Sequence, residues 1–287
     1  MKLSIITINY NDATGLKKTL DSVAKQTCCD FEHIIVDGNS TDGSVDVICD
    51  YESTLASRFS GVPYKVHDFV GCSSPLSSRL KWVSEPDKGI YNAMNKGIKM
   101  TTGEYLLFLN SGDCLVDNEV VEYFVSCDNT EDIISGGTLL GYEEQRQKFP
   151  PAELTFELFL HDSLMHAATF IKRNLFEKYG LYNENHRIVS DWEFFVKVLI
   201  NNNCSYAKVD RLISLFDTTG ISNQTAHSEL HIQERNEVIN SMMAYLKPVY
   251  DELMEKRKIC NEYQFLKNGR MGWIVRMCLK LKSKVKK

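Results

Sequence analysis

The stretch Tyr105-Leu106-Leu107-Phe108-Leu109-Asn110-Ser111-Gly112-Asp113 is the most informative part of the sequence, because an apolar run passes directly into a polar turn. Such a run is typical of a buried β-strand. The turn that follows would bring oxygen ligands to one spot at the mouth of a sheet, and Mg²⁺ and Mn²⁺ prefer oxygen ligands. Asn110 to Asp113 is also an ordinary β-turn sequence, so the turn alone leaves both interpretations open.

Similar apolar runs alternate with helical stretches through the first half of the chain. We predict strands at 3–9, 33–37, 81–84, 105–109 and 133–140, and helices at 14–25, 44–51, 90–100 and 118–125. This alternation predicts an α/β fold with a mostly parallel central sheet flanked by helices. Ligands of such sheets bind beyond the carboxyl ends of the strands, so we expect the functional residues there.

Two stretches depart from this alternation. Residues 52–79 are rich in Ser, Gly and Pro, which predicts a long excursion or insertion. After Pro150-Pro151 the pattern becomes α+β, with helices predicted at 154–160 and 191–201. From about Ser228 the sequence is helical in character almost to its end.

The first two predicted strands end in small and polar residues. The first ends in Asn9-Tyr10-Asn11, and the second runs into Asp37 and the residues up to Ser44. A carboxylate at a strand end, here Asp37, can accept a hydrogen bond from a base or a ribose, whereas Asp42 or Ser44 can cap the next helix. A capped turn without a ligand is the alternative. The Gly-x-Gly-x-x-Gly spacing of a dinucleotide fold is absent from this segment.

Composition and charge exclude several classes of protein. The 287 residues are 43% apolar and 25% charged, which is typical of a soluble enzyme, and no apolar stretch approaches the roughly 20 residues that cross a bilayer. Nine cysteines without a Cys-x-x-Cys pair indicate reduced thiols and a cytoplasmic location. Residues 1–262 carry a net charge of -13, which disfavours nucleic acid as a partner.

Taken in order, these motifs resemble the family 2 glycosyltransferases, which are inverting enzymes of GT-A fold common in bacterial surface-polysaccharide assembly. The resemblance covers about residues 3–223. It rests on Ser4 to Asn11 (SIITINYN), Val36 to Ser44 (VDGNSTDGS), Glu85 to Gly97 (EPDKGIYNAMNKG), Thr102 to Asp113 (TGEYLLFLNSGD), His166 to Phe170 (HAATF), Gly180 to Tyr182 (GLY) and Ser190 to Phe194 (SDWEF).

The resemblance implies a role for each matching position. Nucleotide and donor-sugar binding falls on Asn9, Tyr10, Asn11, Asp37, Asn39, Asp42, Asp87, Lys88, Gly89, Asn92, Asn95, Asn110 and Ser111, with Asp37 expected to contact the base. Asp191 matches the catalytic base. His166, Trp192 and Glu193 are expected on the acceptor side. The implied donor is a nucleotide-diphosphate sugar, with uridine as the base on family grounds.

The metal motif departs from the family pattern. Where the family carries Asp-x-Asp, this chain has Asn-Ser-Gly-Asp, so that Asp113 is its one carboxylate. One carboxylate together with diphosphate oxygens suits a weakly held Mg²⁺ or Mn²⁺ that arrives with the substrate. The expected cofactor is therefore a divalent cation bound with the nucleotide diphosphate.

The acceptor-side residues have structural alternatives. Ser190-Asp191-Trp192-Glu193 resembles a helix start, so Asp191 could cap a helix as well as act as the base. A histidine among apolar neighbours, such as His166, is as often a core residue as a ligand-binding one. His227 and His231 have a spacing that can bind zinc, but a third ligand is not evident and a solvated helix face is the simpler interpretation.

The last 25 residues differ in charge from the rest. Residues 263–287 contain eight basic and no acidic side chains, and apolar residues recur at helical spacing beside Trp273. A basic amphipathic helix suits an anionic membrane surface, which would place the protein at the inner face of the cell membrane near polyprenyl- or lipid-linked acceptors. A helix packed on the body, or on a second copy in a homo-oligomer, is the alternative.

These observations predict a glycosyltransferase of hexosyltransferase type that acts on a glycan or lipid-linked hydroxyl in capsule, O-antigen or exopolysaccharide synthesis. We expect a GT-A domain at 1–223, with a nucleotide-binding half at 1–113 and an acceptor half at 114–223, and a helical extension at 224–287. A catalytically weak nucleotide-sugar-binding protein and a nucleotidyltransferase are the rivals. The second should carry a basic loop after the first strand, and Tyr10 to Gly15 contains no basic residue.

Overall fold

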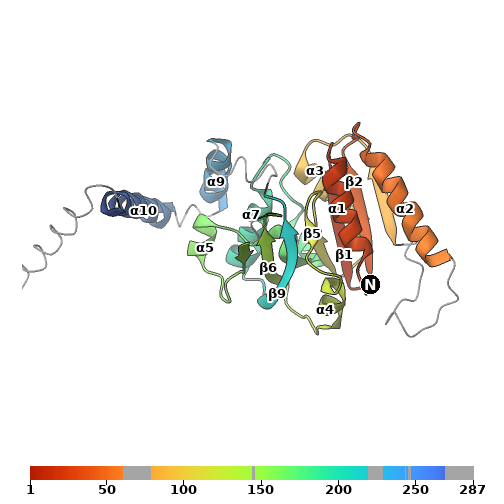
Figure 1. Ribbon diagram of the computed structural model, residues 1–287. Helices are drawn as coiled ribbons and strands as arrows, with labels where there is room; N and C mark the ends of the chain where they lie inside the picture. Colours follow the sequence, from red (N-terminus) through yellow and green to blue (C-terminus); the bar gives the residue numbers. More distant parts are fainter. Residues whose placement is uncertain (61–78, 144–145, 219–228, 243, 245–246, 269–287) are drawn as a thin grey trace, which may run out of the picture. The chain divides into compact units, whose positions relative to one another are not determined.

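The computed structural model describes residues 1–60, 79–143, 146–218, 229–242, 244 and 247–268 (Figure 1). Two compact units divide the chain, Met1–Arg235 and Asn236–Lys287. The first unit contains the whole sheet. Of the second unit, the structure describes the end of α9 (Glu229–Met242) and α10 (Lys247–Asn268).

The first half of the chain alternates strands with helices, as the sequence predicts. Its elements are β1 (Leu3–Asn9), α1 (Ala13–Ala24), β2 (Phe31–Asp37), α2 (Ser44–Ser60), β3 (Leu80–Ser84), α3 (Ile90–Met100), β4 (Tyr105–Phe108), β5 (Cys114–Leu115), α4 (Val120–Ser126) and β6 (Ile133–Leu140). The five predicted strands and four predicted helices all exist, and β1, α3 and β6 have the predicted bounds.

The prediction of an excursion beginning at Glu52 was wrong for its first part, because α2 continues to Ser60. Ile48, Tyr51 and Leu55 lie three and four residues apart and are buried in one apolar cluster with Ile35 of β2. This burial holds the helix together through the Ser-containing stretch. Residues 61–78 of the predicted excursion lie outside the described residues.

The second half is mixed in character. It contains β7 (Arg146–Lys148), α5 (Phe156–His161), the short 3-10 helix η2 (His166–Ala168), β8 (Thr169–Lys172), α6 (Arg173–Tyr179), α7 (Ser190–Phe195), the π-helical turn η3 (Val196–Asn201) and β9 (Tyr206–Phe216). The helices predicted at 154–160 and 191–201 correspond to α5 and to the α7–η3 segment. β8 and β9 were not predicted.

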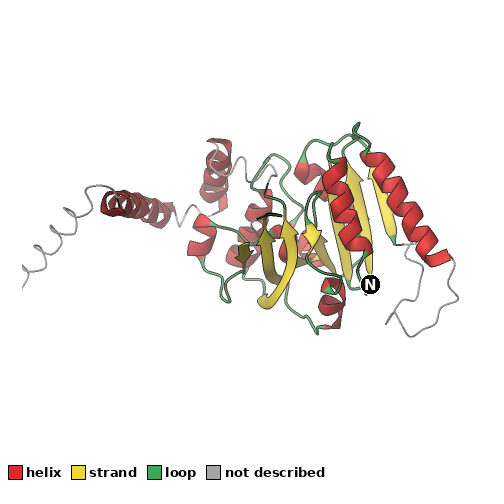
Figure 2. Ribbon diagram, in the orientation of Figure 1, coloured by secondary structure: helices red, strands yellow, loops and turns green. Residues whose placement is uncertain are grey.

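One sheet joins the two halves in the order β3-β2-β1-β4-β8-β6-β9-β5, and β7 pairs with β6 (Figure 2). The pairs β3–β2, β2–β1 and β1–β4 are parallel, and β8 pairs antiparallel with both β4 and β6. The predicted α/β fold is therefore confirmed, with a sheet that is parallel in its first four strands and mixed beyond them. The carboxyl ends of β1, β2, β3 and β4 lie at one edge.

Helices cover both faces of the parallel part, and β1, β2 and β4 are buried along their whole length, whereas the edge strand β3 is half-buried. α1 and α2 lie side by side on one face, where Leu16, Leu20 and Ile35 share a cluster (Figure 1). α3 packs on the other face, and a Cβ at Gly97 would lie 2.6 Å from Ile6 Cγ2. This close packing fixes α3 against β1.

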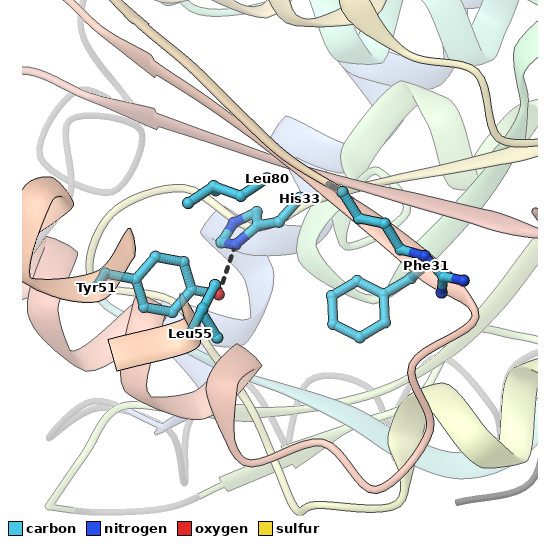
Figure 3. A pocket seen from close by; sticks show the side chains of 6 residues that line it. Phe31, His33, Tyr51, Leu55 and Leu80 are labelled. Carbon is cyan, nitrogen blue, oxygen red and sulfur yellow. Dashed lines mark hydrogen bonds between the residues drawn. The ribbon is translucent and has the colours of Figure 1, made fainter. Parts of the chain in front are cut away.

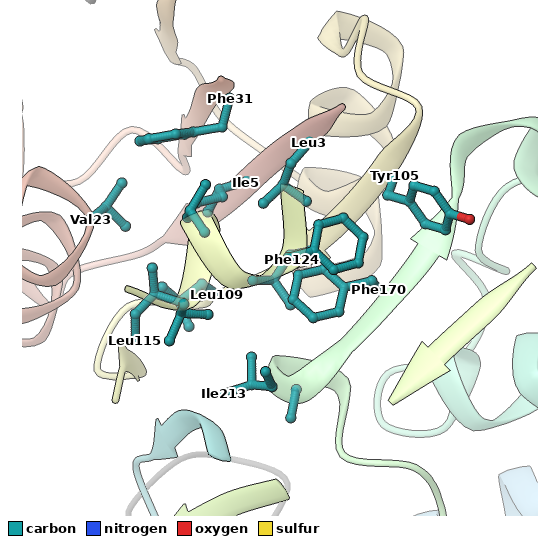
Figure 4. Close-up of a cluster of buried hydrophobic side chains, with 14 of the residues drawn as sticks. Leu3, Ile5, Val23, Phe31, Tyr105, Leu109, Leu115, Phe124, Phe170 and Ile213 are labelled. Atoms are coloured by element: carbon teal, nitrogen blue, oxygen red, sulfur yellow. The ribbon is translucent and has the colours of Figure 1, made fainter. Parts of the chain in front are cut away.

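A second cluster fills the space where the two halves of the sheet meet. It includes Leu3 and Ile5 of β1, Phe124 of α4 and Phe170 of β8 (Figure 4). The rings of Phe124 and Phe170 are stacked with their centroids 3.8 Å apart. Because these residues are buried, β8 and the segments that follow it are held rigidly beside β4.

Candidate active site

Asp37, at the carboxyl end of β2, is the centre of a hydrogen-bonded cluster at the edge of the sheet. Its Oδ1 accepts from Asn9 Nδ2 (2.8 Å) and Ser40 Oγ (2.6 Å), and its Oδ2 accepts from the Ser40 amide (2.9 Å) and Ser84 Oγ (2.7 Å). Burial would raise the pKa of Asp37, but the hydrogen bonds from Ser40, Ser84 and Asn9 outweigh it and hold the pKa below its usual value. The Asp37 carboxylate therefore ties β1, β2 and β3 together.

The residues after β1 complete this cluster. Asn9 is buried, and its Oδ1 accepts a hydrogen bond from Ser111 Oγ at 3.0 Å. Asn11 has a φ of +50°, which turns its amide toward Ser40 Oγ at 2.8 Å. Asn tolerates this left-handed conformation better than most residues. The ends of β1 and β2 and the turn after β4 are thus joined by side chains.

Tyr10 and Asp87 approach each other over Gly38. A Cβ at Gly38 would lie 2.6 Å from Asp87 Oδ2 and 3.0 Å from the Tyr10 ring, so this position accepts only glycine without displacement. The Tyr10 side chain is 67% exposed, which is unusual for an aromatic residue beside a buried strand. An exposed ring and a carboxylate over a bare backbone form a surface on which a flat polar molecule can stack.

Asn39 and Asp42 lie in the loop after β2. Asn39 is exposed, with a φ of +63°. Asp42 accepts hydrogen bonds from the amides of Ala13 and Ser44, which are the first residues of α1 and α2. The Ser44 hydroxyl and these amides lower the pKa of Asp42. Asp42 thus has the capping role that its sequence context indicates.

The segment from Asp87 into α3 links the carboxyl-end edge of the parallel strands to the second half of the fold. Asp87 Oδ1 accepts from the Gly89 amide (2.8 Å), and Gly89 adopts a φ of +121°. The Lys88 amide donates to Asn92 Oδ1. Asn92 and Asn95 donate to the two oxygens of Glu184 at 2.8 and 2.9 Å.

Asn95 is only 2% exposed, and both ends of its amide are engaged, its Oδ1 by the Tyr182 amide. Its side chain therefore fixes the segment around Tyr182 and Glu184. Any influence of Asn95 on a donor would pass through that segment.

The turn after β4 is held in place by hydrogen bonds to α1. Thr19 Oγ1 lies 2.7 Å from the Asp113 carbonyl and accepts from the Gly112 amide, and Gly112 has a φ of +95°. The Asp113 amide donates to the Asn110 carbonyl, which closes the turn. Asn110 Oδ1 is buried without a hydrogen-bond partner among the described residues.

Asp113 lies at the end of this turn and is 4% exposed. Its Oδ1 accepts from the amide of Asp217, the residue after β9, at 2.9 Å. Burial, and next the Asp217 carboxylate, raise the pKa of Asp113 to about 8 although the hydrogen bond lowers it. Two acidic groups thus lie close together in a poorly solvated place.

These features fit a divalent cation chemically. The turn offers the carboxyl oxygens of Asp113 and the unpartnered Oδ1 of Asn110, and a dication would relieve the repulsion between Asp113 and Asp217. No group of three His, Cys, Asp or Glu side chains suitable for a metal exists in the described part of the chain. A cation here would therefore need further oxygen ligands from a molecule that binds the protein together with it.

Asp191 lies in the first turn of α7, where it contacts α3. The helix has Val189 as its N-cap residue and no side-chain capping bond, so the capping alternative for Asp191 does not apply. Asp191 Oδ1 accepts a hydrogen bond from the hydroxyl of Tyr91, in α3, at 2.8 Å. Its side chain is partly exposed.

His166 lies close to Asp191 in an aromatic setting. Its ring stacks on Phe108 with centroids 4.5 Å apart, and Nε2 lies 2.8 Å from the Tyr182 hydroxyl. Burial lowers the pKa of His166, and the Asp191 carboxylate opposes this effect only in part. His166 is therefore neutral near pH 7.

Trp192 and Glu193 are both engaged with the protein itself. Trp192 is 3% exposed, and its Nε1 donates to the Phe159 carbonyl at 2.9 Å, so that it faces the interior. Glu193 Oε2 lies 2.8 Å from Nδ1 of His186. Both residues support the segment around Asp191, and their predicted contact with an acceptor stays a prediction.

Two residues with a clear place in this site were missed from the sequence. Tyr91 lies within the segment expected along the donor, and its hydroxyl contacts Asp191 of α7. Glu234 of α9 is 3% exposed and accepts from the amides of Arg187 and Ile188 at 2.7 and 3.0 Å. The next residue, Arg235, lies over the Trp192 ring. The sequence carried no signal for Glu234, because its partners are backbone amides.

A small pocket at the opposite end of the strands has a different character. It is lined by Phe31, His33, Tyr51, Leu55, Arg79 and Leu80 (Figure 3). His33 Nδ1 lies 3.1 Å from the Tyr51 hydroxyl, and its Nε2 lies 2.9 Å from Thr7 Oγ1. With no carboxylate in its lining and both histidine nitrogens engaged, this pocket is part of the core.

Comparison with known proteins agrees with this geometry. The model of glycosyl transferase family 2 matches residues 4–188. The PGL/p-HBAD biosynthesis glycosyltransferase of Mycobacterium bovis (strain BCG / Pasteur 1173P2) is 30% identical over 201 residues, covering 69% of this chain and 70% of that protein. An uncharacterized glycosyltransferase of Mycobacterium tuberculosis (strain CDC 1551 / Oshkosh) is 30% identical over 226 residues, covering 76% of each.

Two solved structures share the fold at low sequence identity. S. aureus TarS 1-349 in complex with UDP-GlcNAc is 18% identical with a TM-score of 0.57, covering 76% of this chain and 58% of the TarS 1-349 chain. The mannosyltransferase PcManGT from Pyrobaculum calidifontis, in complex with GDP-Man and Mn²⁺, is 14% identical with a TM-score of 0.59, covering 99% of this chain and 80% of that one. This chain thus spans under two thirds of the TarS chain.

Proposed function

The chain belongs to glycosyl transferase family 2 and is a glycosyltransferase of GT-A fold, and we propose that it is an inverting enzyme that uses a nucleotide-diphosphate sugar. The proposed donor is a UDP-sugar, and the proposed acceptor is a hydroxyl of a glycan or of a lipid-linked saccharide. The product would belong to a capsule, O-antigen or exopolysaccharide. Bound UDP-GlcNAc in TarS and GDP-Man in PcManGT support the donor class.

One observation carries the proposal: the segment from Asp87 to Tyr91 spans the two halves of the site. Asp87 lies over Gly38 beside the exposed Tyr10, and Tyr91, four residues later, donates to Asp191. A nucleotide placed on Tyr10 would therefore direct its diphosphate and sugar along the start of α3 toward Asp191. In-line attack needs this arrangement, because the acceptor must approach from the side opposite the leaving group.

The reaction that we propose is a single displacement. The acceptor oxygen attacks the anomeric carbon, its proton passes to the Asp191 carboxylate, and the carbon–oxygen bond to the diphosphate breaks with its electron pair on the nucleotide. Attack from the opposite face inverts the anomeric centre. The rings of His166 and Tyr182, which are in contact through His166 Nε2, would border the acceptor side.

The leaving diphosphate carries most of the charge that develops. A divalent cation, Mg²⁺ or Mn²⁺, held by Asp113 and the Oδ1 of Asn110 would neutralise that charge as a Lewis acid. Ser111 and the Asn9–Asn11 segment would contact the nucleotide side. Asp37 and Asp42 would act mainly by holding these loops in place, since their carboxylates already accept hydrogen bonds from the protein.

We propose in addition that residues 263–287 hold the enzyme at the inner, anionic surface of the cell membrane. Among the described residues, no helix is long and apolar enough to span a bilayer. Residues 269–287 and His227 lie outside the described residues, so the tail and the His227–His231 pair rest on the sequence alone. Sedimentation with anionic liposomes tests the tail, and equal pelleting of the chain with and without residues 263–287 would contradict it.

A thermal-shift screen tests the donor proposal. UDP, GDP, UDP-GlcNAc, UDP-glucose and GDP-mannose would be added with and without Mn²⁺, because a ligand that binds the folded state raises its Tm. We expect a uridine nucleotide to stabilise the protein most, and Mn²⁺ to add to the effect. No shift with any nucleotide in the presence of Mn²⁺ would contradict the proposal. Tyr10→Ala should weaken the shift, whereas Tyr51→Phe, in the core pocket, should not.

A further inference from the structure

The hydroxyl of Tyr91 has a choice of two acceptors. It lies 2.8 Å from Asp191 Oδ1 and 2.7 Å from the carbonyl oxygen of Ile188. A phenol has one proton to donate, so at any moment it can serve only one of these oxygens well. An ionised carboxylate is the stronger acceptor, because charge-assisted hydrogen bonds are about twice as strong as neutral ones. With Asp191 ionised, the proton therefore points to Oδ1.

We propose that Tyr91 is a positioning residue for the base: its buried hydroxyl holds Oδ1 of Asp191 and leaves Oδ2 for the acceptor hydroxyl. This inference rests on the proposed function of Asp191. Within the described ranges, the Tyr91 hydroxyl makes the one side-chain hydrogen bond to the Asp191 carboxylate. The carboxylate is thus oriented by a single donor from a neighbouring helix.

The environment of Tyr91 suits this role. Its side chain is 6% exposed and packs against Tyr182, with ring centroids 5.7 Å apart. Burial, together with the Asp191 carboxylate, raises the pKa of Tyr91 well above its usual value. Tyr91 therefore stays protonated and remains a donor throughout the reaction, rather than passing a proton on.

The alternative acceptor is also held in place. The amides of Arg187 and Ile188 both donate to the buried carboxylate of Glu234, which fixes the peptide whose carbonyl faces Tyr91. When Asp191 takes the proton of the acceptor on Oδ2, Oδ1 becomes a weaker acceptor. The Tyr91 proton can then turn to the Ile188 carbonyl without leaving a buried donor unpaired.

Tyr91→Phe tests this arrangement, because it removes the hydroxyl and keeps the ring. The other titratable groups that face Asp191 are His166 on η2 and Tyr182, and both remain in the variant. Tyr51→Phe is the matched control, since Tyr51 is equally buried and its hydroxyl bonds to a single side chain, His33. Both variants lose one buried hydroxyl and should lose similar stability.

The first readout does not depend on activity. The full chain would carry aspartate labelled with ¹³C at Cγ, and the signal of Asp191 would be identified by its loss in Asp191→Asn. In Tyr91→Phe we expect the chemical shift of this signal to change, because the carboxylate loses the side-chain hydrogen bond from Tyr91. Tyr51→Phe should leave it in place. An unchanged chemical shift in Tyr91→Phe would overturn the inference.

The second readout is release of UDP from UDP-GlcNAc or GDP from GDP-mannose with Mn²⁺. Tyr91→Phe should lower kcat roughly 10-fold at pH 7 and leave the KM for the donor unchanged. An active wild type with an unaffected Tyr91→Phe variant would overturn the inference alone. A wild type that binds and cleaves neither donor would contradict the proposed function, and with it the catalytic use of Tyr91.

Discussion

The two carboxylates that we assign to the donor side and to the acceptor side, Asp37 and Asp191, are held in opposite ways. Asp37, on the donor side, is fully buried and accepts four hydrogen bonds from the protein. Asp191, on the acceptor side, is partly exposed and accepts one side-chain hydrogen bond within the described residues, from Tyr91. A saturated carboxylate can fix loops but has little capacity left for a substrate. A carboxylate with an unused oxygen can take a proton.

Two His–Tyr contacts, one in each region, differ in a similar way. His33, in β2, has both ring nitrogens engaged, by Thr7 and Tyr51. His166, beside Asp191, is hydrogen-bonded to Tyr182 through Nε2, and the Asp191 carboxylate acts on its pKa. Residues of the same type thus belong to the core in one region and lie beside the proposed base in the other. The surroundings decide which role a residue has.

The largest expected effect separates the two carboxylates directly. Asp191→Asn should lower turnover roughly 10²-fold or more, because the acceptor proton loses its destination, while donor binding should not change. Nucleotide release and the thermal shift with UDP-GlcNAc and Mn²⁺ measure the two properties. Glu177→Gln, a surface carboxylate paired with Arg173, is the control and should behave as wild type. Turnover close to wild type in Asp191→Asn would remove Asp191 from its role.

Asp37→Asn should act on binding and stability rather than on the chemical step. The amide replaces an oxygen that accepts two hydrogen bonds, so that a buried donor faces other donors, at a cost of about 2 kcal/mol in the free energy of unfolding. Urea denaturation measures this loss, and calorimetry should show weaker donor binding as the loops after β1 and β2 loosen. A variant that keeps full stability and donor binding but has a lower kcat would show that Asp37 acts on the chemical step, contrary to this prediction.

Glu234→Ala should loosen the segment before Asp191 without touching the donor side. Two charge-assisted hydrogen bonds to the amides of Arg187 and Ile188 are lost, which we expect to speed hydrogen exchange at these amides by roughly 10-fold. Exchange measured by NMR or mass spectrometry gives the readout. The exposed Glu229 on the same helix provides the control, Glu229→Ala. Equal exchange in both variants would show that Glu234 does not hold the segment.

The smallest expected effect concerns His33 and pH. Burial lowers the pKa of His33 to about 3, against 6.5 when unfolded, so the unfolded chain binds more protons between these values. Stability from this residue is therefore complete above about pH 6.5 and is lost as pH falls. Between pH 7 and pH 6 the loss should be about 0.7 kcal/mol. His33→Gln should lose less over that interval in urea titrations, and an equal loss would assign the pH dependence elsewhere.

Much of the parallel half could be predicted from the sequence, because its strands are continuous apolar runs that end in polar turns. The strand-end rule located Asp37 and the turn at Asn110 to Asp113 correctly at one edge. The same rule would have found Asp217, had β9 been predicted. The strand was missed because its residues, such as Lys208, Asp210 and Arg211, do not form an apolar run.

The acceptor side was less predictable for a physical reason. Asp191 is brought to the site by its contact with Tyr91, a hundred residues away in sequence, and local patterns do not record such contacts. The burial of Trp192 and the support from Glu234 likewise depend on how α7 and α9 pack within the first unit. The predicted boundary at 223/224 differs from the division of the compact units at 235/236, and Glu234, near the start of α9, contacts the segment before Asp191.

The most direct test of the account is the anomeric configuration of the first sugar released. With UDP-GlcNAc, whose sugar is α-linked, and Mn²⁺, water can replace the acceptor, and proton NMR follows the anomers before they equilibrate. A single displacement assisted by Asp191 predicts that β-GlcNAc is formed first and that Asp191→Asn slows its formation roughly 10²-fold or more. Initial release of α-GlcNAc by the wild-type protein would contradict it.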